Sequence, residues 1–516
     1  MVEVDPLTGA ESVPRDDSLW LSTTPSTNYA PLDGDHRFDT VVVGGGIAGL
    51  STAITLKDAG QSVAVVEAGR IVEGTTGHTT AKLTAQHGLV YDDLESRFGA
   101  ARARQYAEAN RAGIEEVAAR VDRLGIDCDF RRRPAYTYTA SIDDLEAIHR
   151  EVDTARRLGL PASYTESVDL PFDVEGAVRF DEQAEFHPRK YLLAIAAAIH
   201  GDGCAVYERT RATDIDRGDG GSHRPTVRVG TNRGEIRSDD VVVASHFPFS
   251  DHAGYFARMH PWRSYLLAVR IDESPPNGMY YSTNSPPETI RSHPTADGEL
   301  LIVGGQKHRP GTGPDPSVHY RRCEAYARQR FSVQSIEHRW STHDYTTVDR
   351  VPFVGQIGPR AKNTYVATGF GGWGLAAGTA AGSILSDLIR GRANPWAEVF
   401  DPQRITPRAS ARTFLTENTR TGVRMVADRT RQLLSRGEDG PEPGEATVSR
   451  QSGDPVARYR DDDGELHTVS AICPHMGCVV DWNDAERTWD CPCHGSRFNY
   501  DGDVIRGPAM EDLAEK

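Results

Sequence analysis

Lysine is almost absent from this chain of 516 residues, which has six lysines among its 58 basic residues. The acidic residues number 74, so the formal net charge is −16 at pH 7. This charge argues against nucleic acid or an anionic membrane surface as a partner, because both attract basic surfaces. An acidic excess with arginine in place of lysine indicates either a protein of a high-salt (halophilic) cytoplasm or an ordinary acidic protein from a GC-rich genome.

Long apolar runs are also absent, since none approaches the roughly 18 residues of a membrane-spanning helix. The first 30 residues are acidic and polar, and they lack the basic region, apolar core or twin arginine of an export signal. We therefore expect a cytoplasmic protein without a membrane span. The length exceeds one compact core and predicts about three domain-sized units.

Cysteine is scarce, and four of the seven residues lie in one C-terminal stretch, while Cys128, Cys204 and Cys323 are scattered as inert thiols would be. The stretch contains Cys473-Pro-His-Met-Gly-Cys478 and Cys491-Pro-Cys-His-Gly-Ser496. In Rieske [2Fe–2S] centres one iron takes two thiolates and the other takes two imidazoles. A structural zinc site is the alternative interpretation, but it leaves two of these residues without a role.

The order C-x-H-x2-C followed by C-x-C-H-G-S resembles the Rieske family. Neutral imidazole ligands reduce the negative charge of the cluster, which raises its reduction potential. The resemblance implies one iron bound by Cys473 and Cys491, the other bound by His475 and His494, and a disulfide between Cys478 and Cys493.

Three further residues bear on the properties of the predicted cluster. Ser496 matches the hydroxyl donor of the Rieske family, and Gly507-Pro508-Ala509 resembles the loop that covers the cluster. Phe498 stands where high-potential members often have a tyrosine that donates to a ligand sulfur. We therefore predict a potential below the upper end of the Rieske span of roughly −150 to +300 mV.

A dinucleotide-binding pattern begins at residue 38. A buried β-run over 38–43 leads into a glycine-rich turn, a helix over 47–59 and a second β-run that ends at Glu67. In this context Gly44 permits the tight turn and Gly46 lets the backbone approach a diphosphate at the helix N-terminus. Glu67 is placed to bind a ribose hydroxyl.

The loop after the second β-run favours FAD over NAD. Residues 70–84 resemble the flavin-contacting loop of the D-amino-acid oxidase (DAO) superfamily, in which a Gly-rich turn such as 369–374 closes over the flavin. No second GxGxxG follows, which argues against a bound nicotinamide donor. The residues predicted to bind FAD are Gly44, Gly46, Ile47, Ala48, Gly49, Glu67, Ala68, Gly69, His78, Thr79, Thr80, Lys82, Ala212, Ala244, Gly369, Gly371, Gly372, Trp373 and Gly374.

Two roles are open for His78. Gly74-Thr-Thr-Gly-His78 resembles the Gly-Thr-Thr-Trp-His run of dimethylglycine-type dehydrogenases, in which that histidine carries the flavin covalently. Glycine replaces tryptophan here, so we favour a polar, noncovalent contact.

From about residue 18 the chain resembles FAD oxidoreductases of the DAO superfamily with a C-terminal Rieske domain (the YhfW type). The predicted fold class is an α/β FAD-binding Rossmann-type domain interleaved with an α+β substrate domain, followed by a small all-β Rieske domain. The predicted segments are an extended lead-in (1–37), FAD-binding parts (about 38–90, 180–245 and 341–400), a substrate domain (about 91–179 and 246–340), a helical linker (401–444) and the Rieske domain (445–516).

A flavin takes two electrons from a C–H bond next to an amine or hydroxyl, whereas a [2Fe–2S] cluster takes one electron at a time. Their fusion predicts a dehydrogenase that oxidises a small amine or amino acid and passes electrons singly to an external acceptor, such as a ferredoxin-like carrier. Two alternatives stay open: a hydroxy-acid dehydrogenase, and an electron-transfer protein that relays between protein partners. The pocket candidates are Arg263 as a carboxylate clamp with Tyr265 beside it, and His308, His343 and Tyr345 as acid–base or orienting groups.

Overall fold

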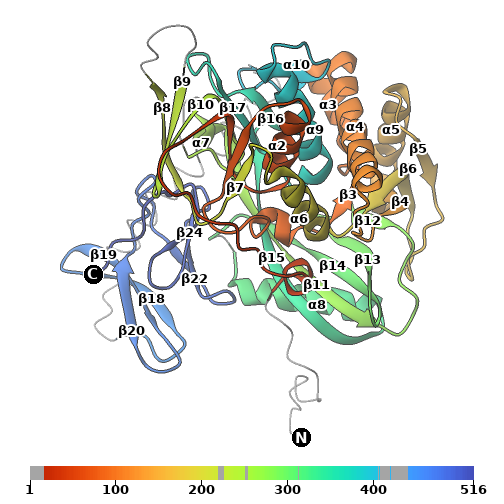
Figure 1. The fold of residues 1–516 in the computed structure, drawn as a ribbon. Coiled ribbons are helices and arrows are strands. Elements are labelled where there is room, and N and C mark those ends of the chain that lie inside the picture. The colour runs from red at the N-terminus through yellow and green to blue at the C-terminus, as the bar shows by residue number, and fades with distance from the viewer. Residues whose placement is uncertain are drawn as a thin grey trace, which may run out of the picture.

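The computed structural model describes residues 17–218, 226–249, 254–311, 313–404, 406, 416, 419 and 440–516. Most of the predicted linker and the start of the predicted lead-in lie outside these residues. Within them the chain forms two large sheets with helices packed against them, followed by a small C-terminal β-domain drawn in blue (Figure 1). The predicted fold class is confirmed.

The first large sheet has eight strands and holds the dinucleotide-binding pattern. Strand β1 runs parallel to both β2 and β10, so the carboxyl ends of these strands meet at one edge. The main order is β16-β17-β10-β1-β2-β7, and β9 joins β8 to β10. The strands are β1 (His36–Val43), β2 (Val63–Val66), β7 (Ala205–Tyr207), β8 (Ala212–Gly218), β9 (Thr226–Thr231), β10 (Gly234–Val243), β16 (Phe353–Gln356) and β17 (Thr364–Thr368).

The second large sheet has nine strands in the order β15-β11-β14-β13-β12-β4-β6-β3, with β5 paired to β6. Its edge strand β15 (Val333–Thr347) pairs with β11 (Met259–Ile271) along the whole length of β11. The other strands are β3 (Lys82–Leu83), β4 (Arg131–Thr139), β5 (Ala162–Thr165), β6 (Gly176–Glu185), β12 (Met279–Ser282), β13 (Thr289–Thr295) and β14 (Gly298–His308).

Two predicted boundaries fall inside strands of this sheet. The return to the FAD-binding part at about residue 180 falls inside β6, which stays in the nine-stranded sheet to Glu185. The boundary at 340 falls inside β15, because its pairing with β11 continues to Thr347. Both parts of the oxidoreductase therefore meet along β15.

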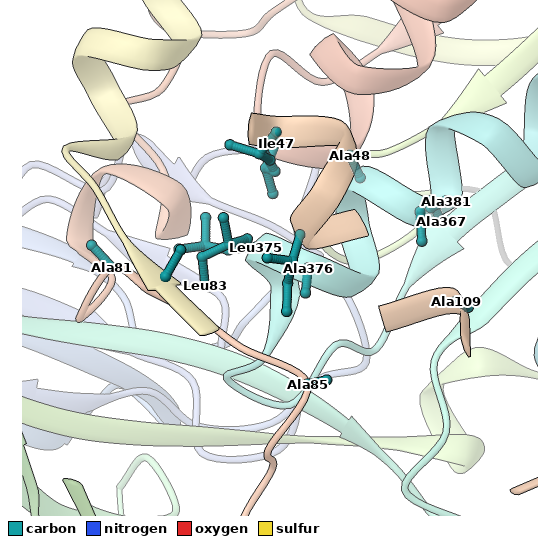
Figure 2. Packing of buried hydrophobic residues seen from close by; sticks show 14 of the residues in the cluster. Ile47, Ala48, Ala81, Leu83, Ala85, Ala109, Ala367, Leu375, Ala376 and Ala381 are labelled. Carbon is teal, nitrogen blue, oxygen red and sulfur yellow. The ribbon is translucent and has the colours of Figure 1, made fainter. Parts of the chain in front are cut away.

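Small residues let the helices behind the first sheet pack closely. Helix α2 (Ile47–Asp58) lies against α9 (Gly374–Ile389), and Figure 2 shows Ile47, Ala48, Leu375 and Ala376 in this contact. A side chain at Gly382 would meet the Ser51 backbone at 2.7 Å, so only glycine fits there. The remaining helices are α1 (Leu19–Ser22), η1 (Thr75–His78), α3 (Tyr91–Phe98), α4 (Ala100–Leu124), η2 (Ile142–Asp144), α5 (Leu145–Arg157), α6 (Pro188–Ile199), α7 (Tyr255–Arg258), α8 (Pro316–Arg330) and α10 (Ala397–Phe400). Among the described residues, none of the helices combines the length and apolarity needed to cross a membrane.

The C-terminal domain consists of a three-stranded and a four-stranded antiparallel sheet. Its core contains Trp489 and Phe498 together with the cysteines of the cluster motif. The strands are β18 (Ala446–Gln451), β19 (Asp454–Arg460), β20 (Leu466–Ser470), β21 (Asp481–Asn483), β22 (Thr488–Asp490), β23 (Arg497–Phe498) and β24 (Val504–Arg506).

Candidate active site and cluster site

A cavity of about 330 Å³ lies at the carboxyl ends of the parallel strands, between the two large sheets. The glycine-rich turn after β1, the η1 loop and the turn before α9 all contribute to its wall. The predicted FAD-binding residues that line it are Gly44, Gly46, Ile47, Ala48, Glu67, Ala68, Thr79, Thr80, Lys82, Ala212, Ala244, Gly371, Gly372, Trp373 and Gly374. Gly49, Gly69, His78 and Gly369 do not line it.

The turn after β1 has the geometry of a dinucleotide cradle. A side chain at Gly44 would meet the Ala244 carbonyl oxygen at 2.4 Å, and its backbone φ is +113°. A side chain at Gly49 would meet the Gly44 carbonyl oxygen at 1.9 Å, so Gly49 acts through packing. The N-terminus of α2 therefore opens directly onto the cavity, as a diphosphate group requires.

Glu67 lies at the end of β2 in this cradle. Its carboxylate accepts hydrogen bonds from the Gly45 and Gly69 amides at 2.8 and 3.0 Å. Burial raises the pKa of Glu67, while these amides and the charge of Arg211 lower it. The residues present thus fit the adenosine and diphosphate parts of FAD.

The η1 loop is held in place by hydrogen bonds from two tryptophan side chains. The Trp20 indole donates to the Thr79 carbonyl at 2.6 Å, and the Trp340 indole donates to the His78 carbonyl at 3.0 Å. Trp20 is fully buried in the short helix α1. A local sequence pattern could not reveal either hydrogen bond, because the donor and the acceptor lie 59 positions apart for Trp20 and 262 positions apart for Trp340.

His78 turns toward its own loop. Its Nδ1 lies 2.9 Å from the Gly74 carbonyl oxygen, and its side chain is not part of the cavity wall. Burial, and to a smaller extent the charge of Arg506, lower the pKa of His78 to about 4. The noncovalent role fits this placement better than the covalent one.

The five predicted catalytic residues, Arg263, Tyr265, His308, His343 and Tyr345, all lie outside the wall of this cavity. Successive side chains of a strand point to opposite faces of the sheet. The cavity is lined instead by their neighbours Trp262, Ser264, Lys307, Thr342 and Asp344.

Arg263 contacts the C-terminal domain instead of a substrate. Its guanidinium lies 2.8 Å from the Asp490 carboxylate and 3.5 Å from that of Glu486. Arg497 pairs with the same two carboxylates. Burial raises the pKa of Glu486, but Arg497 and Arg263 outweigh this effect and hold it at about 2. Arg263 is 2% exposed, so this is a buried ion-pair network between the domains.

Tyr265 and His308 form a packed group on the same side of the sheet. The Tyr265 hydroxyl lies 3.1 Å from His308 Nε2, and the Tyr265 ring stacks on His319 at 5.0 Å. Tyr265 is fully buried in this group. These contacts give both residues a structural role.

The cluster motif brings its predicted ligands together in two pairs. The Cys473 and Cys491 thiols contact each other, which lowers the pKa of Cys473 and raises that of Cys491. The His475 and His494 rings lie 5.0 Å apart between centroids. Cysteines 478 and 493 form the implied disulfide. Two thiols and two imidazoles in separate pairs suit a two-iron cluster better than a single zinc ion.

Hydrogen-bond donors surround the thiol pair. The contact with Cys491 lowers the pKa of Cys473 most, and burial raises it. The Ser496 hydroxyl and the His475 and Met476 amides donate to the Cys473 sulfur and lower its pKa further. Ser496 in turn accepts from the Ala509 amide at 2.9 Å, so the predicted covering loop lies over the motif.

The Cys491–Ser496 loop packs on the outer face of β15, which is the face that points away from the cavity. The Tyr345 hydroxyl donates to the His494 carbonyl at 2.5 Å. A side chain at Gly495 would meet the His343 ring at 2.3 Å, so the loop and the ring are in direct contact. The His475 and His494 rings also face Phe247 and Phe256 of the oxidoreductase. The imidazole side of the motif is thus covered by the oxidoreductase.

The DAO family model, FAD dependent oxidoreductase, matches residues 39–388, and the Rieske [2Fe-2S] domain model matches residues 431–515. The putative Rieske 2Fe-2S iron-sulfur protein YhfW of Bacillus subtilis is 36% identical over 97% of both chains. Gamma-glutamylputrescine oxidoreductase of Escherichia coli is 28% identical over 73% of this chain and 89% of its own length. The structure of glycine oxidase from Geobacillus kaustophilus covers 72% of this chain and all of its own, with a TM-score of 0.58 at 20% identity.

These matches agree with the two parts of the molecule described above, a dinucleotide cavity and a cluster motif. The family brings FAD to the first part and a Rieske [2Fe–2S] cluster to the second. The chain belongs to the DAO family of FAD-dependent oxidoreductases and carries a C-terminal Rieske domain.

Proposed function

We propose that the protein is a dehydrogenase that oxidises a small amine or amino acid at FAD and passes the electrons singly through the Rieske cluster to an external acceptor. The observation that carries this proposal is the position of the cluster loop on β15. The cavity lies on one face of β11 and β15, and the Cys491–Ser496 loop packs on the other face. The two cofactor sites are therefore separated by one layer of sheet at β11 and β15, and by the loop over the cluster motif where residues 505–510 line the cavity.

Amines and amino acids are favoured as substrates by the relatives. One is described as acting on gamma-glutamylputrescine, and the glycine oxidase structure shares the fold of the oxidoreductase part. Bound flavin supplies the capacity to take two electrons from a C–H bond next to nitrogen, and the cluster supplies one-electron transfer.

The protein's own residues hold the two sites together and keep water out. His343 and Tyr345 fill the space between the cavity wall and the cluster loop, and both are 1% exposed. Thr75 of the η1 loop donates to the His343 carbonyl at 2.8 Å, so the flavin loop and the strand under the cluster are bonded directly. A dry, rigid junction of this kind favours transfer to the cluster over reaction with O₂.

An anaerobic screen of metabolites tests the proposal. The full-length protein with both cofactors is mixed with amines, amino acids and hydroxy acids, and flavin absorbance and the electron paramagnetic resonance of the reduced cluster are followed together. We expect an amine or amino acid to bleach the flavin and then to reduce the cluster.

Two other outcomes contradict it. Bleaching by hydroxy acids alone identifies the alternative dehydrogenase, and bleaching only by a reduced carrier protein identifies a relay. Turnover with O₂ as fast as with an artificial one-electron acceptor would show an oxidase.

A further inference from the structure

The C-terminal domain contributes part of the cavity wall. Residues 505–510, which follow the start of β24 and form the loop over the cluster motif, line the cavity together with the strands of the nine-stranded sheet. Arg506 is the charged residue of this segment. The oxidoreductase part alone therefore has an incomplete pocket.

Among the residues that the structure describes, no carboxylate forms an ion pair with Arg506, although the charges of Glu486 and Asp344 act on it. Nearby, Arg263 and Arg497 share the carboxylates of Asp490 and Glu486. Within the described part of the chain, the Arg506 side chain has no ion pair or hydrogen bond of its own. Burial and the charges of Arg497 and Arg263 lower the pKa of Arg506 to about 10, so it stays a cation at neutral pH.

A second cation and one carboxylate lie in the same wall. Lys307 projects over the Trp262 ring at 5.3 Å, and its pKa is lowered by burial and raised by Asp344. Burial raises the pKa of Asp344, while Lys307 and Arg506 lower it, so the three charges interact. This part of the cavity wall thus contains two cations, Arg506 and Lys307, and one carboxylate, Asp344. A bound anion would balance the excess positive charge.

The diphosphate of FAD is a poor candidate for that anion. The diphosphate position is the N-terminus of α2, next to Glu67, and the arginine whose charge acts on Glu67 is Arg211. Burial is the main cause of the lowered pKa values of His78 and His246, and the charge of Arg506 is the second cause. Because Arg506 also acts on Asp344 and both line the cavity, we place Arg506 at the end of the cavity where Asp344 and Lys307 lie.

We propose that Arg506, with Lys307 in the same cavity wall, binds the carboxylate of the substrate, so that the Rieske domain supplies a specificity-determining residue to the oxidoreductase. This inference rests on the proposed function and narrows its substrate to carboxylate-bearing compounds. Arginine suits the role, because its planar guanidinium binds a carboxylate through two charge-assisted hydrogen bonds. It takes the part that the sequence suggested for Arg263, whose guanidinium is occupied by Asp490.

The test uses the full-length protein with both cofactors and small carboxylates as probes. Acetate, propionate and benzoate are titrated, and their neutral amides serve as matched probes; perturbation of the flavin absorbance gives each Kd. We expect the carboxylates to bind and the amides not to bind. Arg506→Gln should weaken carboxylate binding at least tenfold, and Arg506→Lys should weaken it less.

Arg487→Gln is the control, because Arg487 is a half-exposed arginine of the same domain that pairs with Asp462. It should leave every Kd unchanged. Flavin content and the cluster spectrum establish that each variant is folded.

Three results would overturn the carboxylate site: no carboxylate binding by the wild-type protein, equal binding by Arg506→Gln, or a lowered flavin midpoint potential in Arg506→Gln with an unchanged Kd. The last result would mean that Arg506 acts on the cofactor. None of these affects the proposed dehydrogenase, which fails separately if no metabolite reduces both flavin and cluster.

Discussion

The two faces of β11 and β15 carry different chemistry. On the inner face, Trp262, Ser264, Thr342 and Asp344 line the cavity. On the outer face, Arg263, His343 and Tyr345 hold the Rieske domain. Because side chains alternate along a strand, neighbouring residues of one strand serve the cavity and the cluster. The pairing of these two strands therefore brings the two redox sites next to each other.

Loss of a cluster ligand should produce the largest difference between the cavity face and the cluster face. Cys473→Ser is expected to remove the [2Fe–2S] cluster completely, while the cavity face keeps FAD and its reduction by substrate. The electron paramagnetic resonance and visible spectra report the cluster, and acceptor reduction should disappear with it. Cys323→Ser, at a buried free thiol of the oxidoreductase, is the control and should keep the cluster. A wild-type cluster spectrum in Cys473→Ser would refute the ligand assignment.

The buried ion pairs on the outer face come next. Arg263→Met leaves Asp490 short of a partner and should weaken docking of the Rieske domain by about 4 kcal/mol. Hydrogen exchange of the 491–496 loop measures this change. Arg270→Met on the same strand removes a more exposed arginine and should cost less than about 1 kcal/mol. Equal effects of the two substitutions would contradict the docking role of Arg263.

Acid should weaken the same contact. The pKa of Glu486 is about 2, below its ordinary value of 4.5, so its contribution is complete above about pH 4.5 and is lost as the pH falls toward 2. The shift corresponds to about 3 kcal/mol at neutral pH. Loop protection against hydrogen exchange, measured across this pH window, should fall in the wild-type protein. In Glu486→Gln the protection of this loop should be low already at neutral pH, and it should depend less on pH than in the wild-type protein.

The contact between Gly495 and His343 is the next in size. Gly495→Ala places a methyl group 2.3 Å from the His343 ring and should weaken docking by about 2 kcal/mol beyond the backbone cost. The rate of cluster reduction after flavin reduction should fall. Gly464→Ala has a similar positive φ with no atom within 4 Å, so it isolates the backbone cost. The double variant Gly495→Ala, His343→Ala should recover the rate; failure to recover would argue against this contact.

The smallest effect concerns the cluster itself. Phe498 is fully buried in the core that contains the cluster cysteines. Phe498→Tyr adds a hydroxyl donor toward a ligand sulfur, and one hydrogen bond of about 1 kcal/mol should raise the cluster potential by about 40 mV. A redox titration followed by electron paramagnetic resonance measures it. A lowered or unchanged potential would contradict the predicted role of this position.

Local patterns were the most predictable part of the molecule. The glycine turn after β1 lines the cavity, and the cluster motif pairs its thiols and its imidazoles. The glycine turn and each of the two cysteine–histidine runs span few residues, so local backbone geometry fixes the positions within each run, while the pairing of β21 with β22 lies between the two runs of the cluster motif. The ends of β6 and β15, by contrast, depend on strand pairing with partners that are distant in the sequence, and the predicted boundaries at 180 and 340 fall inside these two strands.

The sequence by itself determined the two cofactor motifs and the fold class. The tertiary structure alone decided that Arg263 faces Asp490, that Asp344 and Lys307 face the cavity, and that Arg506 enters it from the other domain. The physical reason is the two-residue period of a strand: a shift of one position moves a side chain to the opposite face, and only packing against distant residues selects the face.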